Sequence, residues 1–333
     1  MPITPSTKIW MDGEYVDWDD ARVHVLTPSL HYGWGVFEGI RAYATDAGPA
    51  VFRLTDHMKR LYRSAKIYHM EPPVSLEGAV KVTKDLVTMN DLPACYIRPL
   101  VFLGYGEIGL NPLTSPISMV IACWPWGAYL GEDSFETGVR AKISSWRRLD
   151  HNIIPPAAKA TGQYINSSLA KAEAIKAGYD EGILLNPNGY VTDGSGENVF
   201  AVRDGVLYTP PLSAGCLAGI TRDSIIAIAE GEGIEVRQTT WSAPTCTWPT
   251  RPSSPARPPR SCPSGRWTTG SSATRAPLPA GCRRSSRPPP GAATSATATG
   301  SKRSPSTNAG GSAPRAPPKN QSPEGASVVC ARP

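Results

Sequence analysis

Residues 181–210 read EGILLNPNGYVTDGSGENVFAVRDGVLYTP and predict two β-hairpins in direct succession. Short apolar runs flank Asn188-Gly189 and Asp204-Gly205, and Asn-Gly and Asp-Gly favour the two-residue turns of hairpins. Upstream, VRAKISSW (139–146) predicts a strand, and YINSSLAKAEAIKAG (164–178) predicts a helix closed by a terminal glycine. These stretches define a lobe in which helices pack on antiparallel strands.

The sequence before this lobe has the same character. Residues 8–54 alternate apolar runs with turn signals and predict an antiparallel sheet, whereas residues 54–68 have helical apolar spacing. A second helix over 75–90 and two strands, CYIRPLVFLGY (95–105) and ISMVIACWPW (117–126), follow. Helices segregated against mostly antiparallel sheets favour an α+β fold. We expect an N-terminal lobe over 1–127, a linker over 128–136 and a second lobe over 137–240.

The composition changes abruptly at residue 241. Residues 241–333 hold 18 of the 34 prolines but one of the 28 acidic residues, Glu324. Their 13 basic residues give 13 − 1 = +12, whereas residues 1–240 carry 21 − 27 = −6. With one Leu, two Val and no Ile, Met, Phe or Tyr, this tail has too little apolar surface to offset the entropy of ordering it. We expect it to be disordered.

Other features exclude several classes of protein. No run of 18 apolar residues exists, and the start MPITPSTKIWMDGEY has neither a signal-peptide nor a transit-peptide pattern, so we expect a cytoplasmic protein without a membrane partner. Cys95, Cys123 and Cys216 lack metal-ligand spacing and are expected to be reduced, buried thiols. No metal site is expected.

A few residues could carry chemistry on their pattern alone. Lys159 lies among small apolar residues, where a lysine amine loses its proton more readily and becomes a nucleophile, although it could simply precede a helix and reach solvent. Gly219-Ile220-Thr221-Arg222 opens a predicted helix and offers an anion site or only a cap. Arg60 could pair with a phosphate or lie on a solvated helix face, and the loop Gly194–Asn198 could approach a ligand or be a plain loop.

Six separate sequence motifs, which follow one another in the family's order, closely resemble those of the branched-chain amino acid aminotransferases. These enzymes belong to the class IV, pyridoxal-phosphate-dependent aminotransferases. The motifs are LHYGWGVFEGIRAY (30–43), YIRPL (96–100), WPWGAYLG (124–131), PPAAKATGQYINSSLAKAEA (155–174), EGILLNPNGYVTDGSGENVF (181–200) and GITRDSI (219–225). The resemblance covers about residues 8–240. It implies the two-lobed fold-type IV architecture, with the second lobe incomplete because the pattern stops near residue 240.

The resemblance also implies roles for individual residues. Lys159 would bond covalently to pyridoxal 5′-phosphate and move the substrate proton, as both anchor and acid/base. Glu197 would face the pyridine nitrogen and Tyr164 the phenolic oxygen, while Arg60, Ile220 and Thr221 would hold the phosphate. The substrate pocket would be formed by residues at the matching positions Tyr32, Phe37, Tyr96, Arg98, Trp126 and Tyr129, with Arg98 pairing with the second carboxylate of glutamate. For the aromatic residues, ordinary core packing remains the alternative.

One family motif is missing after residue 241. In these enzymes a loop containing TGTAAE helps to hold the phosphate and the substrate carboxylate, whereas this chain reads WSAPTCTWPTRPSSPARPPRSCPSGRW (241–267). Read in a shifted frame with permitted third bases, the codons for this stretch give LVRADLYLADEAFFTGTAAEVVPVRSV. We therefore hypothesise that a single-base change near Thr240 puts residues 241–333 out of frame. A basic arm that binds polyanions is the rival interpretation, but its charge needs no nucleic-acid function.

The expected activity is transfer of the amino group between L-Leu, L-Ile or L-Val and 2-oxoglutarate in a homo-oligomer whose partners are small amino acids and 2-oxo acids. Within the family, a D-amino-acid aminotransferase or an aminodeoxychorismate lyase is the alternative. From another class, the chain as written could be a catalytically inactive, frame-shifted product with a non-specific basic tail. We expect this literal chain to have poor solubility and little or no activity.

Overall fold

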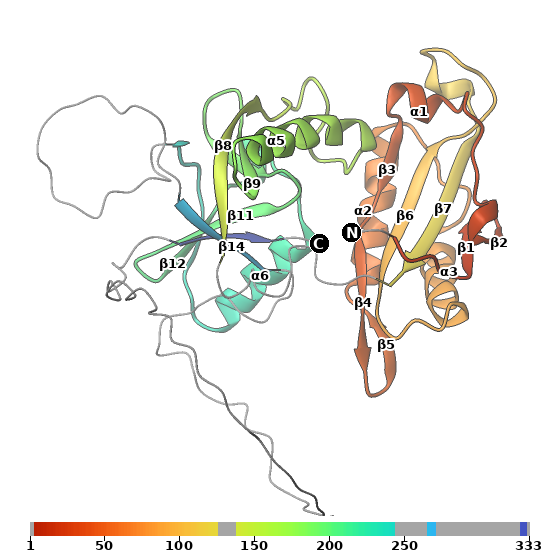
Figure 1. The fold of residues 1–333 in the computed structure, drawn as a ribbon, viewed down its shortest axis with the longest axis horizontal. Coiled ribbons are helices and arrows are strands. Elements are labelled where there is room, and N and C mark those ends of the chain that lie inside the picture. Colours follow the sequence, from red (N-terminus) through yellow and green to blue (C-terminus); the bar gives the residue numbers. More distant parts are fainter. Residues whose placement is uncertain (1–2, 126–137, 244–264, 271–326, 332–333) are drawn as a thin grey trace, which may run out of the picture.

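The computed structural model describes residues 3–125, 138–243, 265–270 and 327–331. The expected linker over 128–136 lies outside the described residues, as do Trp126 and Tyr129. Within the described residues, two separate β-sheets form two lobes, and each carries its own helices (Figure 1). The α+β class predicted from the sequence is confirmed.

The first lobe is an antiparallel sheet in the order β2-β1-β7-β6-β4-β5, with β3 paired to β6. A turn at Asp12 and Gly13, both with positive φ, joins β1 to β2, as the Asp-Gly signal predicts. The strands are β1 (Lys8–Met11), β2 (Glu14–Asp17), β3 (Gly35–Phe37), β4 (Ile40–Thr45), β5 (Gly48–Val51), β6 (Cys95–Leu103) and β7 (Ile117–Trp124). The helices are α1 (Pro28–Tyr32), α2 (Leu54–Ile67) and α3 (Leu76–Met89).

Helices α2 and α3 form because their apolar residues recur at helical spacing. In α2, Leu54, Met58, Leu61 and Ala65 are buried against the sheet, so the predicted apolar face is confirmed. Helix α3 begins at Ser75, whose hydroxyl accepts the Gly78 N–H at 3.1 Å as an N-cap. The core of the first lobe thus fixes the position of α2, which carries Arg60.

The second lobe is a sheet in the order β10-β9-β8-β14-β15-β11-β12-β13, and β10 also pairs with β11, which closes the sheet on itself. Helix α5 packs on β8 and β9. The strands are β8 (Val139–Arg147), β9 (Glu181–Leu185), β10 (Val191–Gly194), β11 (Asn198–Arg203), β12 (Val206–Thr209), β13 (Val236–Gln238), β14 (Gly265–Gly270) and β15 (Ser327–Ala331). The helices are α5 (Tyr164–Lys176) and α6 (Ile220–Gly231).

Strands β14 and β15 correct one expectation. The composition of residues 241–333 predicts disorder, yet residues 265–270 pair with β8 and residues 327–331 pair with β11. Without them, β8 and β11 would face each other as unpaired strand edges, which strongly favour an added strand. Both runs contain adjacent β-branched residues, Thr268-Thr269 in the first and Val328-Val329 in the second, which favour strands. Within the described residues, the sheet of the second lobe is therefore continuous.

The three cysteines of the described part, Cys95, Cys123 and Cys216, are free and buried, as predicted. Burial raises the pKa of the Cys216 thiol to about 12, so it stays protonated. No helix of the described part is long and apolar enough to cross a membrane.

Candidate active site

Lys159 lies at the junction of the two lobes and is held there by its backbone. Its carbonyl accepts the N–H of Phe37 in β3 at 3.0 Å, and its own N–H donates to the Ser64 hydroxyl of α2 at 3.1 Å. The side chain is 5% exposed, and Nζ donates to the Tyr164 hydroxyl at 2.6 Å. A lysine that belongs to the second lobe in sequence is thus fixed by its backbone on the first lobe and directed at the first residue of α5.

The Lys159 amine faces a cavity that is partly open to solvent. All six residues predicted for the cofactor line it: Arg60, Lys159, Tyr164, Glu197, Ile220 and Thr221. The structure adds lining residues that the sequence analysis did not single out as ligands: Arg148, Asp193, Ser195, Gly196, Asn198, Leu217 and Gly219. The cavity therefore combines one amine, two carboxylates and two guanidinium groups.

The turn between β10 and β11 carries the carboxylate of Glu197 into this cavity. Asp193 and Asn198 pair across the turn, and the Gly196 N–H donates to Glu197 Oε2 at 3.2 Å. Glu197 is buried, with 4% exposure. The loop Gly194–Asn198, for which the sequence left a plain loop open, is thus a tight turn beside the cavity.

The first turn of α6 forms one wall of the cavity. Gly219 is its N-cap and has no side chain to satisfy the first helical N–H groups, and Ile220 and Thr221 follow on the cavity wall. A Cβ on Gly219 would lie 1.9 Å from Oδ1 of Asn198, whose amide nitrogen donates to the Leu217 carbonyl at 2.9 Å. Glycine is therefore required here, and the helix N-terminus is available to an anion.

Arg60 is held by a buried carboxylate that the sequence analysis missed. Glu38 is fully buried and accepts two hydrogen bonds from Arg60, Nε to Oε1 and Nη2 to Oε2, both at 2.6 Å. His57 Nδ1 lies 2.8 Å from Glu38 Oε2. Burial alone would raise the pKa of Glu38, but the charge and hydrogen bonds of Arg60 outweigh it and lower the pKa to about 2. Burial lowers the pKa of His57, which is therefore neutral near pH 7. The signal for Glu38 in the sequence was its position as an acidic residue between buried residues of two strands, β3 and β4.

In Glu38→Gln, the free energy of unfolding is expected to fall less steeply as the pH is lowered. Since the pKa of Glu38 is about 2 in the fold against 4.5 ordinarily, this carboxylate stabilises the folded protein fully above about pH 4.5. The contribution is lost as pH falls from there toward about 2. Urea unfolding at a series of pH values should give a shallower acid slope for Glu38→Gln than for the parent or for Glu77→Gln, an exposed residue of α3. Parallel curves for parent and Glu38→Gln would contradict this.

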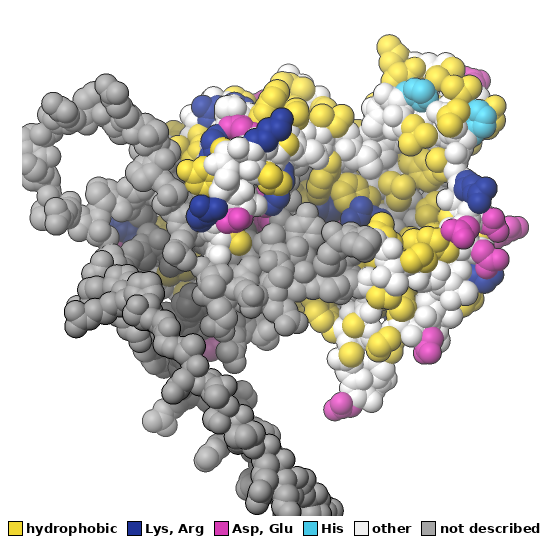
Figure 2. All heavy atoms as spheres, in the orientation of Figure 1, with side chains coloured by type: hydrophobic (Ala, Val, Ile, Leu, Met, Phe, Trp, Pro, Cys, Tyr) yellow, Lys and Arg dark blue, Asp and Glu magenta, His cyan; other side chains and the backbone are white. Residues whose placement is uncertain are grey.

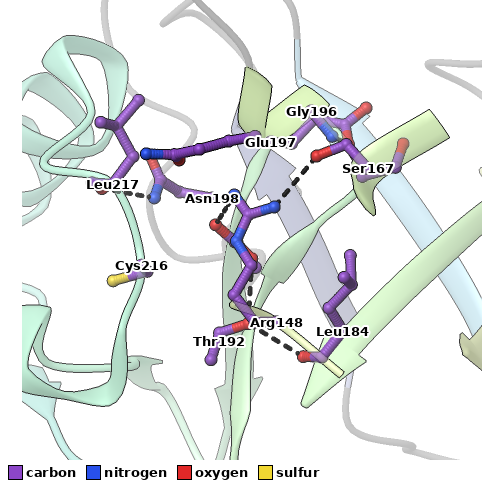
Figure 3. A network of polar contacts seen from close by, with 12 residues as sticks. Arg148, Ser167, Leu184, Thr192, Gly196, Glu197, Asn198, Cys216 and Leu217 are labelled. Atoms are coloured by element: carbon purple, nitrogen blue, oxygen red, sulfur yellow. Dashed lines mark hydrogen bonds and ion pairs between the residues drawn. The ribbon is translucent and has the colours of Figure 1, made fainter. Parts of the chain in front are cut away.

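A second buried ion pair lies at the base of the cavity. Arg148 Nη2 donates to Asp193 Oδ2 at 2.9 Å, and Nη1 donates to the Ser167 hydroxyl of α5 at 3.0 Å (Figure 3). Thr192 donates to Asp193 Oδ1 at 2.9 Å and so fixes the other carboxylate oxygen. Burial raises the pKa of Asp193, and the Arg148 charge opposes this. These contacts tie the residue after β8 to α5 and β10.

Three residues predicted for the substrate pocket form a cluster that reaches Lys159 through Phe37. Phe37 packs on Tyr164 with ring centroids 4.8 Å apart, and Lys159 Nζ lies 5.0 Å from the Phe37 centroid. The Arg98 guanidinium lies 4.7 Å from the same ring, and Nη2 donates to the Tyr96 hydroxyl at 3.0 Å. A Cβ on residue Gly39 would lie 2.0 Å from that hydroxyl, so glycine makes room for the Tyr96 ring.

Tyr32 does not join this group. It ends α1, is 45% exposed and does not line the cavity, because the short helix lies on the outer surface of the first lobe. None of the four described residues predicted for the substrate pocket lines the cavity. Phe37, Tyr96 and Arg98 form a cluster that contacts Lys159, whereas Tyr32 lies outside this cluster.

Comparison with known proteins agrees with this geometry. The family model described as Amino-transferase class IV matches residues 35–245. The branched-chain-amino-acid aminotransferase of Escherichia coli (strain K12) is 50% identical over 231 residues, which cover 69% of this chain and 75% of that protein. The chain belongs to the class IV aminotransferase family.

Solved structures give the same result. The crystal structure of the Escherichia coli branched-chain amino acid aminotransferase superposes with a TM-score of 0.71 at 48% identity, covering 72% of this chain and 79% of that one. The branched-chain amino acid aminotransferase of Thermobaculum terrenum, solved in its PLP-form, superposes with a TM-score of 0.68 at 34% identity, covering 72% and 79%. The fold and family implied by the sequence resemblance are confirmed.

Proposed function

We propose that this chain is a branched-chain amino acid aminotransferase that uses pyridoxal 5′-phosphate to move an amino group between L-Leu, L-Ile or L-Val and 2-oxoglutarate. The observation that carries the proposal is the buried Lys159 amine, hydrogen-bonded to Tyr164 in a cavity that also contains Glu197 and a helix N-terminus. Half of the aligned residues are identical to those of a protein named as such an enzyme.

The residues of the cavity fit this cofactor at each of its polar groups. Arg60 and the uncapped N-terminus of α6 suit a phosphate, because both present N–H donors and positive charge. Glu197 suits a protonated ring nitrogen, and the Tyr164 hydroxyl suits a phenolic oxygen. When bound, the cofactor accepts the electron pair left on the substrate Cα and carries the amino group between the two substrates.

Lys159 supplies the amine for covalent attachment and then moves the proton at the substrate Cα. Its low exposure excludes bulk water from the amine, and Phe37 beside Nζ keeps that side of the site apolar. The hydrogen bond with Tyr164 holds Nζ in one position when the amine is free. Lys159 thereby acts as nucleophile and as general acid and base.

Phe37, Tyr96 and Arg98 are assigned to the substrate side chain. The two rings offer apolar contact to Leu, Ile or Val. Among the described residues, the Nε–H of Arg98 is buried without a hydrogen-bond partner, and it can donate to the second carboxylate of glutamate. One wall can thus accept both apolar and acidic side chains, as the two half-reactions require. The predicted residues Trp126 and Tyr129 would complete this wall but lie outside the described residues.

A homo-oligomer is supported by an exposed apolar surface on the first lobe. Val25, Leu30, Leu110 and Leu113 are 63–88% exposed, and Figure 2 shows hydrophobic side chains gathered around α1 and the loop between β6 and β7. Covering this surface with a second copy would also cover Tyr32, which a single chain leaves exposed. Sedimentation velocity should give a dimer or larger species, and a monomer at micromolar concentration would contradict the proposal.

A donor panel tests the proposed reaction. Little activity is expected of the purified 333-residue chain, but whatever glutamate it forms with pyridoxal phosphate and 2-oxoglutarate should come from L-Leu, L-Ile or L-Val at least about tenfold faster than from D-Ala. D-Ala accepted with L-Leu refused would favour the D-amino-acid aminotransferase, and pyruvate release from aminodeoxychorismate would favour the lyase. No product from any donor, with the cofactor bound, would favour the inactive frame-shifted product.

A further inference from the structure

Two arginines of the first lobe contact the wall of the cavity formed by the second lobe. Arg60 Nη1 donates to the Ala218 carbonyl at 2.8 Å. Arg53, seven residues earlier, uses Nη1 to donate to the Ile220 carbonyl at 3.3 Å, to Asp223 Oδ2 at 2.7 Å and to the Ser224 hydroxyl at 3.0 Å. The contacts lie within and on both sides of the segment Gly219–Thr221, which lines the end of the cavity proposed for the phosphate.

Arg53 is held in an unusual conformation for this contact. It is the residue before α2, with φ 50° and ψ 37°, a left-handed conformation that residues with a Cβ rarely adopt. Its Nε also donates to Asp56 Oδ2 at 2.7 Å, within the first turn of α2. Strain of this kind persists only where neighbouring contacts fix the residue, and it is frequent next to functional sites.

Arg53 itself does not line the cavity, so it can act only through the segment that it holds. We propose that Arg53 is a positioning residue for the cofactor phosphate: it fixes the first turn of α6 against α2 so that the N–H groups of that turn and Arg60 face one phosphate together. The inference rests on the proposed function, because it needs pyridoxal phosphate as the ligand.

Removal of the Arg53 guanidinium is expected to weaken binding of pyridoxal phosphate more than it lowers the free energy of unfolding. The pair of Arg53 with Asp223 is partly exposed, with side-chain exposures of 28% and 67%, and pairs of that kind stabilise a fold only slightly. An N–H donor that is displaced from the phosphate loses much more binding free energy than this pair contributes to stability, because the strength of a hydrogen bond depends steeply on distance and angle. A purely structural role for Arg53 would instead affect all ligands of the cavity equally.

Arg53→Met tests the proposal, because methionine keeps much of the aliphatic stem and removes every donor. Titration by cofactor absorbance should give a Kd for pyridoxal phosphate raised on the order of tenfold. The Kd for pyridoxal, which lacks the phosphate, should change less than about twofold. Arg53→Lys should recover part of the difference, and Asp223→Asn should reproduce part of it. Lys81→Met is the matched control, since it removes a basic side chain from an exposed ion pair with Asp85 on α3, away from the cavity.

The outcomes separate the positioning role from the proposed function. A parent chain that fails to bind pyridoxal phosphate overturns both. A parent that binds, with Arg53→Met unchanged for both ligands or weakened equally for both, overturns the positioning role alone. A fall in the melting temperature of the cofactor-free protein with no selective loss for the phosphorylated ligand would likewise assign Arg53 a structural role only.

Discussion

Lys159→Ala is expected to abolish transamination, with a fall in kcat/KM on the order of 10³-fold or more, because one side chain supplies both the nucleophile and the proton carrier. The visible absorbance of the lysine-bound cofactor should be lost at the same time. The substitution removes a buried side chain but leaves the backbone contacts of residue 159 with Phe37 and Ser64, which do not depend on the side chain. The fold should therefore persist while the chemistry is lost.

Lys159→Arg is the matched control for charge. It keeps a cation beside Tyr164 and Phe37, so a purely electrostatic role of Lys159 would leave most of the activity in place. Covalent attachment requires a primary amine, and Lys159→Arg should therefore be as inactive as Lys159→Ala. Parent-like turnover by either variant would refute the role given to this residue.

The second large effect is expected from the reading frame after Thr240. Among the described residues, Arg60 and the segment Gly219–Thr221 line the part of the cavity proposed to hold the phosphate, whereas residues 244–264 lie outside the described residues. A single-base correction near codon 240 would replace that stretch with one containing TGTAAE, the loop that in this family also holds the phosphate. Added preorganised donors at a developing or bound anion typically contribute on the order of 10²-fold or more.

The corrected gene should accordingly give an enzyme with kcat/KM for L-Leu raised by about 10²-fold over the 333-residue chain. Resequencing codons 235–270 is the companion measurement, in which we expect one extra or missing base near codon 240. If the DNA matches the chain as written and the corrected product is no more active, the frame-shift hypothesis is wrong. The strands β14 and β15 would then be genuine parts of this lobe.

Local patterns were sufficient for most elements of the fold. The apolar spacing of α2 and the Asp-Gly turn after β1 depend on neighbouring residues, and both were found where the sequence predicted them. The strands β14 and β15 were missed because composition describes the average of a long segment. Pairing of a short run such as SVVCA depends instead on open strand edges elsewhere in the fold.

The residues of the candidate site likewise include some that the sequence predicts and some that it does not. The resemblance of several sequence motifs to one family predicted Lys159, Glu197 and Thr221. The structure brings these three residues to one cavity. Arg53 was not predicted, since its partner Asp223 is 170 residues away and neither residue stands out locally. Tyr32 is the opposite case. It lies in a motif that the sequence makes recognisable, yet its side chain is exposed in a single chain.

The most direct test of the central claim is to find which lysine carries the cofactor. The purified chain is incubated with pyridoxal phosphate, reduced with borohydride to fix the cofactor on its lysine, digested and mapped by mass spectrometry. This readout does not require turnover. The added mass is expected on the peptide that contains Lys159 and should be lost in Lys159→Arg. A stoichiometric adduct on another lysine, or none while L-Leu is converted to its 2-oxo acid, would contradict this expectation.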